Sequence, residues 1–587
     1  MLNCMMHEPF YASGKYVNEH LGLYAGWTTL EGSFSDCMPV YNEKKDLILL
    51  FSGENFVDKE VVDQLKSQGH ECGNSTEARY LIHLYEELGE ERFLQQLNGW
   101  FSGLLVDLRQ NKTILFNDRY GMGRIYYYEG KDAFYFSSEA KALLKVCPEL
   151  REIDLKGLGE FFTCGAVLEN RTLFPKIFLL PGGSKWTFNN SSIKKDFYFR
   201  PSEWENQPIL DKETFYKKFK ETFLHILPRY FDAKQPIGMS LTGGLDTRMI
   251  MACMNLHPWT LPCYTYGGMY RDCYDVKIAR KVAQLCQQTH QVLRLDENFL
   301  SDFSENAEKT IYITDGCTDV SVSHEAYLNR LARSIAPVRI TGNYGSEVIR
   351  SINYLRADIL PVGLLQPDFE NLTKEAEQIF TKANTGHQLS YAVFRLVPWH
   401  LYGRLIAGQS QVTTRTPYMD NDLVGLMYQA PEEIRRSKEP SFRLIADSNQ
   451  ALSGIMTDRG VGWKSNYFFS KLARLFRETS FKAEYFYNHG TPDWLARLDY
   501  RFRKLHPEKL FLGRHKIEHY RIWFRDNLFD YIQSILLDEK SLKRPYVNRH
   551  FLEKIVQGHV NGQGNFTREI NRMLTAELIQ RLLIENI

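Results

Sequence analysis

The sequence predicts a chain of two domains: an α+β domain, then an α/β domain with a parallel sheet and a helical C-terminal extension. Short apolar runs alternate with turns from about residue 20 to 195, and buried strands alternate with helical periods from about residue 208. From about 420 to 587 the pattern is almost entirely helical. A chain of 587 residues is also too long for one hydrophobic core. We place the domains at residues 1–200 and 208–587, with the polar stretch Phe197–Gln207 as a linker.

The first domain is predicted to be rich in strands. Apolar or aromatic runs alternate with polar turn clusters, and one helical pattern, Thr76–Leu88, interrupts them. The tight turn Pro181-Gly182-Gly183 lies near the end of the series. The predicted strands are Leu47–Phe51, Trp100–Val106, Thr113–Phe116, Ile125–Tyr128 and Phe134–Phe136.

The second domain is predicted to contain a parallel sheet. Its short buried strands are Gly238–Leu241, Cys263–Tyr266 and Val338–Thr341, and helical periods separate them. Strands that alternate with helices are typical of a parallel sheet covered on both faces.

Composition argues against several classes of function. Lys and Arg number 72 against 71 Asp and Glu, so no global field favours nucleic acid or an anionic membrane. The start lacks a secretory signal, and apolar runs such as Leu47–Phe51 are too short to span a membrane. The ten cysteines are scattered without a C-x-x-C pair, which argues against a disulfide framework or a cysteine metal cage. A cytoplasmic protein with reduced thiols is expected.

The strongest local signal is the segment Leu241-Thr242-Gly243-Gly244-Leu245-Asp246-Thr247, which follows a buried strand and opens a helix. Adjacent glycines let the backbone turn sharply, and the free N–H groups of a helix start suit a polyphosphate. The hydroxyls of Thr242 and Thr247 are further donors, whereas Asp246 would repel phosphate unless Mg²⁺ lay between them. On this segment alone, a simple helix cap explains the pattern equally well.

The segment resembles the pyrophosphatase-type ATP loop of asparagine synthetases, Ser-Gly-Gly-x-Asp-Ser, with Thr at both hydroxyl positions. Further motifs follow in the family's order. They are Tyr264-Thr265-Tyr266-Gly267, where the family holds adenine through backbone groups; Asp275 to Ala283 followed by His290; Arg415-Thr416-Pro417-Tyr418-Met419-Asp420; and His559, Gly562 and the helix to Ile584. The resemblance implies an adenine-nucleotide α-hydrolase-like (PP-loop) domain. ATP would be bound by Leu241–Thr247, Tyr264–Tyr266, Thr341 and Gly342.

The family's metal-binding segment, Ser-Gly-Glu-Gly-Ala-Asp-Glu, resembles Thr341-Gly342-Asn343-Tyr344-Gly345-Ser346-Glu347. Without a gap, Ser346 replaces the Asp that helps to hold Mg²⁺. With one inserted residue, Glu347 supplies that carboxylate, and Tyr344 aligns with the catalytic Tyr of β-lactam-forming relatives. The resemblance then implies a Mg²⁺ site at Asp246 and Glu347. The alternative is that Glu347 is a solvated residue at a helix start.

The family also uses a Lys that stabilises negative charge during acyl transfer and lies before a Leu-Arg pair. Here Phe442-Arg443 takes the place of the pair. The strict position of the Lys is Glu439, with Lys438 one residue earlier. The resemblance leaves Lys438 and Arg443 as the candidates, and Lys438 is equally consistent with a surface charge.

The first domain resembles the class II glutamine amidotransferases. Phe51-Ser52-Gly53-Glu54, Asn117-Asp118-Arg119-Tyr120-Gly121 and Phe136-Ser137-Ser138-Glu139 match the family's motifs. This implies an N-terminal-nucleophile (Ntn-type) layered β-sandwich with flanking helices. The family's N-terminal nucleophilic Cys is Leu2 here, its oxyanion-site Asn is Ser52 and its substrate-binding Asp is Ser75. Cys4 would serve only after cleavage behind Asn3. We therefore expect a domain that does not hydrolyse glutamine.

The expected function is that of an AMP-forming ligase that makes an amide or lactam, with ATP and Mg²⁺. The carboxylate would be a small molecule, a peptide or a saccharide, and the nitrogen would come from ammonia or an amine. Nucleic acid and membrane are not expected partners, and a homodimer stays open. One rival is a non-catalytic relative that binds nucleotide or a partner protein and regulates. The other is a thiolating adenylase, which the amidotransferase-like first domain disfavours.

Overall fold

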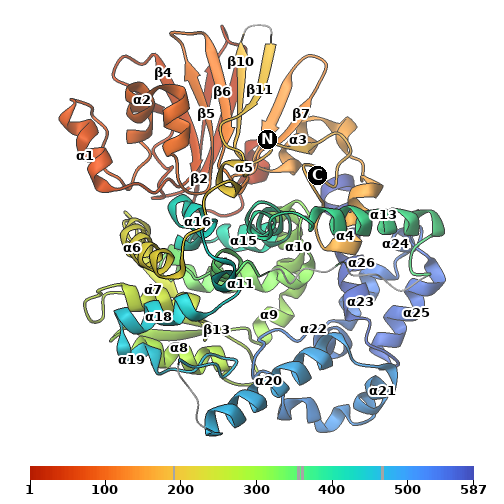
Figure 1. Ribbon diagram of the computed structural model, residues 1–587. Coiled ribbons are helices and arrows are strands. Elements are labelled where there is room, and N and C mark those ends of the chain that lie inside the picture. Colours follow the sequence, from red (N-terminus) through yellow and green to blue (C-terminus); the bar gives the residue numbers. More distant parts are fainter. Residues whose placement is uncertain (190–191, 353–356, 358–362, 464–467) are drawn as a thin grey trace.

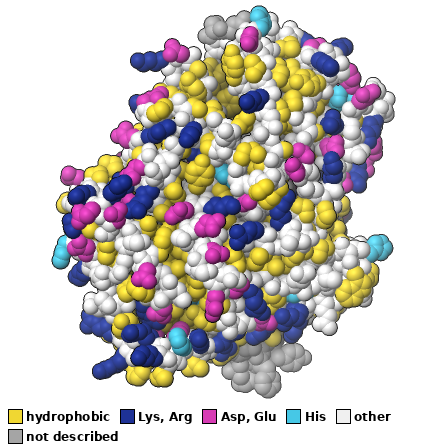
Figure 2. Space-filling model, turned by 180° about the vertical axis from the view of Figure 1, so that it is seen from behind, with side chains coloured by type: hydrophobic (Ala, Val, Ile, Leu, Met, Phe, Trp, Pro, Cys, Tyr) yellow, Lys and Arg dark blue, Asp and Glu magenta, His cyan; other side chains and the backbone are white. Residues whose placement is uncertain are grey.

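The computed structural model describes all residues except 190–191, 353–356, 358–362 and 464–467. In Figure 1 a sheet-rich domain lies above a mixed domain, and a mostly helical C-terminal region lies beside and below the latter. In the part of the chain described, no helix is both long and apolar enough to cross a membrane. Basic and acidic side chains are interspersed over the face seen in Figure 2, as the balanced composition predicts.

The first domain is built on a six-stranded antiparallel sheet of order β11-β10-β6-β5-β4-β3. Leu47–Leu50 of β4 and Leu104–Val106 of β5 are buried, because helices cover one face of the sheet and further strands cover the other. The strands are β3 (Val40–Tyr41), β4 (Leu47–Gly53), β5 (Phe101–Asp107), β6 (Lys112–Asn117), β10 (Ser184–Asn189) and β11 (Ser192–Phe197). This arrangement confirms the predicted layered β-sandwich.

Two smaller antiparallel sheets complete the sandwich. They are β1 (Tyr11–Asn18) with β2 (Leu23–Leu30), and β8 (Phe134–Ser137), β7 (Tyr126–Glu129) and β9 (Phe178–Leu179). Helices α1 (Lys59–Ser67) and α2 (Tyr80–Gln96) lie together on one side of the main sheet. The helix predicted at Thr76–Leu88 thus begins later and continues further, across a kink at Gly89, whose φ of 71° a glycine adopts readily.

The second domain contains a five-stranded parallel sheet of order β14-β13-β12-β15-β16. The strands are β12 (Ile237–Ser240), β13 (Cys263–Gly267), β14 (His290–Arg294), β15 (Val338–Ile340) and β16 (Thr413–Arg415). The chain builds outward from β12 to β14 on one side and then continues on the other side with β15. In such sheets ligands bind beyond the carboxyl ends of the strands, at the point where the order reverses. Here that point lies between β12 and β15.

Helices cover the parallel sheet. They include α6 (Lys212–Tyr230), α7 (Asp246–Cys253), α8 (Tyr274–Leu285), α11 (Ser323–Arg333), α15 (Tyr402–Gln409) and α18 (Glu439–Ser448). The predicted helical C-terminal extension is present, from α20 (Phe468–His489) to α26 (Thr567–Ile579). Phe161 and Phe162 of α4 (Leu155–Cys164) share a core with Trp523 and Leu574 of this extension. Part of the first domain is therefore packed directly against the end of the chain.

The stretch Phe197–Gln207, predicted to be a linker, is folded. It contains α5 (Ser202–Glu205), and the Trp204 ring lies 4.6 Å from that of Phe199 and 5.9 Å from that of Tyr428 between ring centroids. These aromatic contacts fix the segment between the two domains, because large rings bury enough apolar surface to outweigh a polar local sequence.

Candidate functional site

The glycine-rich loop lies at the reversal point of the parallel sheet. It leaves β12 at Leu241 and enters α7 at Asp246. A second loop, after β15, touches it: a Cβ on Gly342 would lie 2.7 Å from the Thr247 backbone nitrogen, and one on Gly345 would lie 2.6 Å from Cγ of Asp246. Glycine at these two positions therefore lets the loops meet.

Hydrogen bonds hold the loop in a defined shape. The Gly243 N–H donates to Oδ1 of Asp275 at 2.7 Å, and the buried Arg248 side chain donates to the Gly243 carbonyl at 3.2 Å. The Gly244 N–H donates to the Thr242 hydroxyl, which itself lies 3.3 Å from the Thr247 hydroxyl. Thr242 is exposed. The loop thus offers a hydroxyl and the start of a helix to a ligand, on a rigid base.

Asp275 makes the base of the loop sensitive to pH. Burial and then Asp458 raise the pKa of its carboxyl to about 6. The pKa of Asp275 is therefore higher in the folded chain than in the unfolded chain. Protonation of Asp275 stabilises the fold at low pH, and this contribution is lost as the pH rises through about 6.

We expect Asp275→Asn, which keeps an acceptor for Gly243, to stabilise the chain at pH 8 by about 2–3 kcal/mol. The gain should vanish near pH 4, and thermal melting at both pH values measures it. The control is Asp447→Asn, because the Asp447 carboxylate accepts from Tyr216 and Lys220 and its loss should destabilise. An unchanged or lower midpoint for Asp275→Asn at pH 8 would contradict this role.

Asp246, the predicted metal ligand, is held by a cation of the protein. Nη2 of Arg350 lies 3.2 and 3.3 Å from the two carboxylate oxygens, and the Ser346 hydroxyl donates to Oδ2 at 3.3 Å. Ser346 therefore faces Asp246, as in the register without a gap. The pairing of Asp246 with Glu347 as metal ligands stays a prediction.

Arg350 is the site residue that the sequence did not reveal. It lies at the end of α12 (Gly345–Arg350) and is buried, with 6% of its surface exposed. Its Nε and Nη1 are buried and have no hydrogen-bond partner among the described residues. Buried N–H groups normally have partners, so these two donors are available to an anionic ligand. The only signal in the sequence was an Arg four residues after the Ser that replaces the expected Asp.

Lys438 and Arg443, the two candidates for the charge-stabilising role, lie in different surroundings. Lys438 lies directly before α18. Burial raises the pKa of Asp246, and the positive charge of Lys438 lowers it again in part. Partial burial and then Arg350 lower the pKa of Lys438. Arg443 instead pairs with Glu213 on α6 at 2.8 Å, and 32% of its side chain is exposed. Lys438, but not Arg443, thus acts on the loop electrostatically.

Tyr344 joins the second loop to the first domain. It is buried, has φ 67°, and its ring meets the Trp100 ring edge-on, with 5.7 Å between centroids. Burial and then the Glu347 carboxylate raise the pKa of Tyr344. Glu347 is itself buried, so it is not a solvated residue at a helix start. The two residues predicted from the gapped register are therefore close to each other.

The remaining residues predicted to bind ATP lie on β13 and after β15. The Tyr264 carbonyl accepts from the Leu241 N–H at 2.8 Å, so the sheet already uses this backbone group. Thr265 bonds to His290 at 2.9 Å, and Tyr266 donates to Asn329 at 2.9 Å. Thr341, whose neighbour Gly342 touches α7, bonds to Asn343 at 3.0 Å.

A cavity of about 200 Å³ lies inside the first domain, at the positions that match the family's glutaminase motifs. Leu2 and Ser52 line it together with Met1 and Met5. Ser75, at the position of the substrate-binding Asp, instead donates to Asp232 of the second domain at 2.6 Å. Burial raises the pKa of the Cys4 thiol, which disfavours the nucleophilic thiolate. The side chain of Leu2 carries neither a thiol nor a hydroxyl group.

A second cavity, of about 250 Å³, lies between the domains and shares Ser52 with the first. Trp100, Glu54, Arg415 and Thr416 line it. Arg415 at the end of β16 forms a buried ion pair with Glu54 at 2.6 Å, and the Thr416 hydroxyl donates to the Asn343 carbonyl at 2.8 Å. Residues of the first domain thus cover one side of the loop that follows β15.

Comparison with known proteins gives two family matches. Residues 27–199 match a family model described as a glutamine amidotransferase domain, and residues 218–441 match one described as asparagine synthase. The asparagine synthetase [glutamine-hydrolyzing] of Zea mays is 24% identical over 323 residues, which cover 53% of this chain and 49% of that protein. Asparagine synthetase [glutamine-hydrolyzing] 1 of Bacillus subtilis is 23% identical over 285 residues, covering 48% and 44%. The chain spans about half the length of these curated relatives.

Solved structures give weaker similarity. The glutamine phosphoribosylpyrophosphate amidotransferase of B. subtilis, complexed with ADP and GMP, matches with a TM-score of 0.23 and 11% identity. The match covers 47% of this chain and 77% of that one.

Proposed function

The chain belongs to an asparagine synthetase-like family, and from that premise we propose that it is an ATP-dependent, AMP-forming carbon–nitrogen ligase that does not hydrolyse glutamine. The observation that carries the proposal is Arg350. Its buried Nε and Nη1 have no partner among the described residues, and it lies beside a glycine-rich loop at the reversal point of a parallel sheet. A phosphate group would satisfy donors of this kind with charge-assisted hydrogen bonds.

In the proposed reaction the substrate carboxylate attacks the α-phosphorus of ATP. The bond to the β-phosphate breaks, and an acyl-adenylate and pyrophosphate form. An amine then attacks the acyl carbon, AMP leaves with the electron pair of the C–O bond, and the nitrogen loses a proton. The protein's contribution is to orient the reactants and to neutralise the developing charge.

Each role falls to residues of the two loops. Thr242, Thr247 and the first turn of α7 would hold the phosphates, with Arg350 as the buried counter-charge. Lys438 would stabilise negative charge on the phosphates during acyl transfer. Tyr344, fixed against Trp100, would line the acyl side. Arg443 has no role in this scheme, because it is paired with Glu213.

A magnesium ion between Asp246 and Glu347 stays a prediction, because Asp246 already has partners within the protein. Asp246 accepts hydrogen bonds from Arg350 and Ser346, and Ser346 stands where the second carboxylate would be needed. Two protein cations, Arg350 and Lys438, already balance charge at this point. We therefore route no step through a metal bound by Asp246 and Glu347.

The proposed nitrogen source is ammonia, a second substrate's amine, or an amine within the same molecule. Leu2 has no nucleophilic atom, Ser52 replaces an amide donor, and Ser75 is bonded to Asp232. The proposed carboxylate is a small molecule, a peptide or a saccharide.

The proposal is tested by measuring pyrophosphate release from ATP with a panel of carboxylates, supplied with ammonia, with amines or with glutamine. We expect release that requires one carboxylate, product formation with ammonia or an amine, and no glutamate from glutamine. Glutamate released at a rate matching product formation would refute the loss of glutaminase activity. Absence of ATP binding would refute the ligase itself.

A non-catalytic, nucleotide-binding regulator is the second candidate. The observation that favours it is the replacement of a metal carboxylate by Ser346, with Arg350 on Asp246. Such a protein would bind ATP through the same loop yet release no pyrophosphate with any acceptor.

A further inference from the structure

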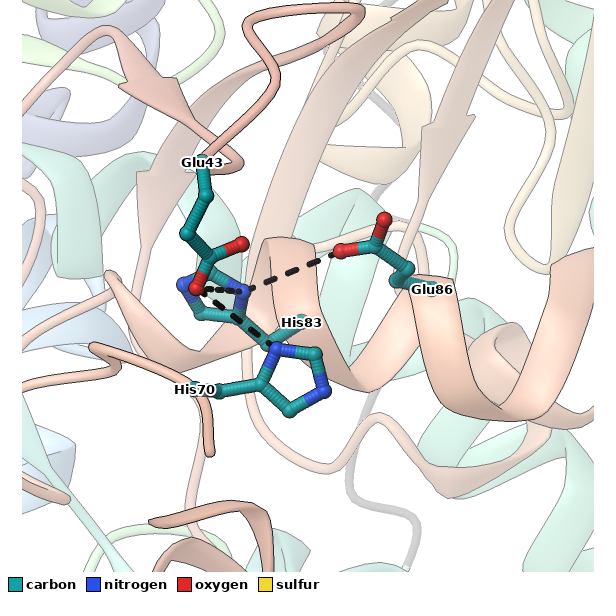
Figure 3. A group of neighbouring side chains, drawn as sticks. All are labelled: Glu43, His70, His83 and Glu86. Carbon is teal, nitrogen blue, oxygen red and sulfur yellow. Dashed lines mark ion pairs between the residues drawn. The ribbon is translucent and has the colours of Figure 1, made fainter. Parts of the chain in front are cut away.

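Two histidines and two glutamates converge at the outer side of the first domain, far in the chain from the ATP loop (Figure 3). Glu43 lies in the turn between β3 and β4, and His70 lies in the loop after α1. His83 and Glu86 lie one turn apart on α2 and so share a face of the helix. One ligand atom from each residue can be chosen so that all four lie within 4.8 Å of one another.

The distances within the cluster suit a common central ion. Nδ1 of His70 lies 3.7 Å and Nδ1 of His83 lies 3.6 Å from Oε1 of Glu43. Oε2 of Glu86 lies 4.0 Å from Nδ1 of His83. Ligands about 2.0–2.2 Å from a tetrahedral Zn²⁺ are separated by roughly 3.3–3.6 Å. Small side-chain shifts would therefore close the cluster around one ion.

A second carboxylate orients His70. Nε2 of His70 lies 2.9 Å from Oε1 of Glu87, and an ionised carboxylate only accepts, so this nitrogen carries the proton. The other ring nitrogen of His70, Nδ1, faces Glu43 and is the atom placed to bind an ion. Metal-binding histidines commonly donate their other N–H to a carboxylate in this way. Glu86 is oriented similarly, since its Oε1 accepts from Asn42 at 3.1 Å.

His83 supplies the second, independent indication of a ligand. Its side chain is 3% exposed, and its Nδ1 has no hydrogen-bond partner in the part of the chain described. Oε2 of Glu86 is likewise buried and unpartnered. Nδ1 of His83 and Oε2 of Glu86 lie 4.0 Å apart, so one bound cation would give both buried atoms a partner.

We propose that Glu43, His70, His83 and Glu86 bind one divalent first-row transition-metal ion, with Zn²⁺ as the best match. Two imidazole nitrogens and two carboxylate oxygens form a borderline donor set in a compact arrangement, which Zn²⁺ accepts in four-coordinate sites. Ca²⁺ and Mg²⁺ prefer six or more oxygen ligands.

Four protein ligands leave no open position, so the ion is structural. It joins the β3–β4 turn, the loop after α1 and the start of α2. That loop continues to Ser75, which bonds to Asp232 of the second domain. The ion thereby fixes a segment that contacts the neighbouring domain.

The test uses the untagged full-length chain, stripped with a chelator and titrated with Zn²⁺ against a chromogenic competitor. Metal analysis after dialysis should give about one ion per chain, and Co²⁺ should give the visible bands of a tetrahedral ion. His70→Ala and Glu43→Gln should each weaken Zn²⁺ binding by at least the roughly 10–100-fold typical of disturbing a metal site. His20→Ala, an exposed histidine of the same domain, is the matched control and should bind as the wild type does.

Thermal melting of the metal-free proteins shows whether a variant has lost a metal ligand or has lost its fold. Glu43 is 42% exposed at its side chain, so Glu43→Gln should melt as the metal-free wild type does and should lose only the increase in midpoint that Zn²⁺ causes. Failure of the wild type to bind Zn²⁺ or Co²⁺ would overturn the proposal. Equal affinity in Glu43→Gln and wild type would also overturn it, since the ion would then bind elsewhere.

Discussion

Replacing Arg415 by alanine should lower the free energy of unfolding by about 3–5 kcal/mol, because it leaves a buried carboxylate unpaired between the two domains. Arg415 is 4% exposed at its side chain and forms hydrogen bonds of 2.6–3.0 Å with Glu54. It also donates to the carbonyls of Tyr230 and Asp232, each at 2.9 Å. One side chain therefore links the end of β16 to the first domain and to the end of α6.

Urea unfolding followed by tryptophan fluorescence measures the loss, with Arg443→Ala as the matched control. Arg443 also forms a two-pronged ion pair, but its partner Glu213 is 68% exposed at its side chain. Exposed pairs contribute little because water screens them. An Arg415→Ala protein that unfolds at the same urea concentration as Arg443→Ala would contradict the proposed domain link.

Arg350→Ala should weaken the binding of a non-hydrolysable ATP analogue by about 100-fold. Charge-assisted hydrogen bonds contribute about 1.5–3 kcal/mol each, and 1.4 kcal/mol corresponds to a tenfold change in affinity. Calorimetric titration measures this effect without knowledge of the carboxylate. Arg443→Ala should bind the analogue as the wild type does.

A double variant, Ser346→Asp with Arg350→Ala, tests whether Mg²⁺ can replace the positive charge of Arg350. It restores a second carboxylate beside Asp246 and removes the resident cation, so analogue binding should recover only when Mg²⁺ is present. Unchanged affinity in Arg350→Ala would show that the buried guanidinium does not hold phosphate. Circular dichroism of each variant checks that the fold is retained.

Most of the correctly predicted strands and helices could be recognised from local sequence patterns. Strand segments such as Leu47–Phe51 are short apolar runs whose burial on both faces leaves little choice of structure. The linker at Phe197–Gln207 stays a prediction, but local polarity did not reveal the helix α5 within it. Packing of Trp204 against Phe199 and Tyr428 depends on residues distant in the chain.

The candidate site was only partly predictable for the same reason. The loop Thr242–Thr247 carries its own signal, since glycines at the end of a strand have local consequences. The residue of α12 that contacts Asp246 depends on which face of that helix turns inward. The sequence did not decide this, because the two possible alignments of Tyr344–Glu347 with the family motif differ by one residue. Contact between Ser346 and Asp246 favours the register without a gap, and Arg350, one turn later, then lies on the same face.

The central claim is that a nucleoside triphosphate binds against the turn between β12 and α7. An experimental structure with a non-hydrolysable ATP analogue tests it most directly. We predict phosphate oxygens within hydrogen-bond distance of Thr242, Thr247 and the unpartnered nitrogens of Arg350. A triphosphate bound elsewhere on the molecule, with Arg350 still engaged only with Asp246 and Ser346, would contradict the account.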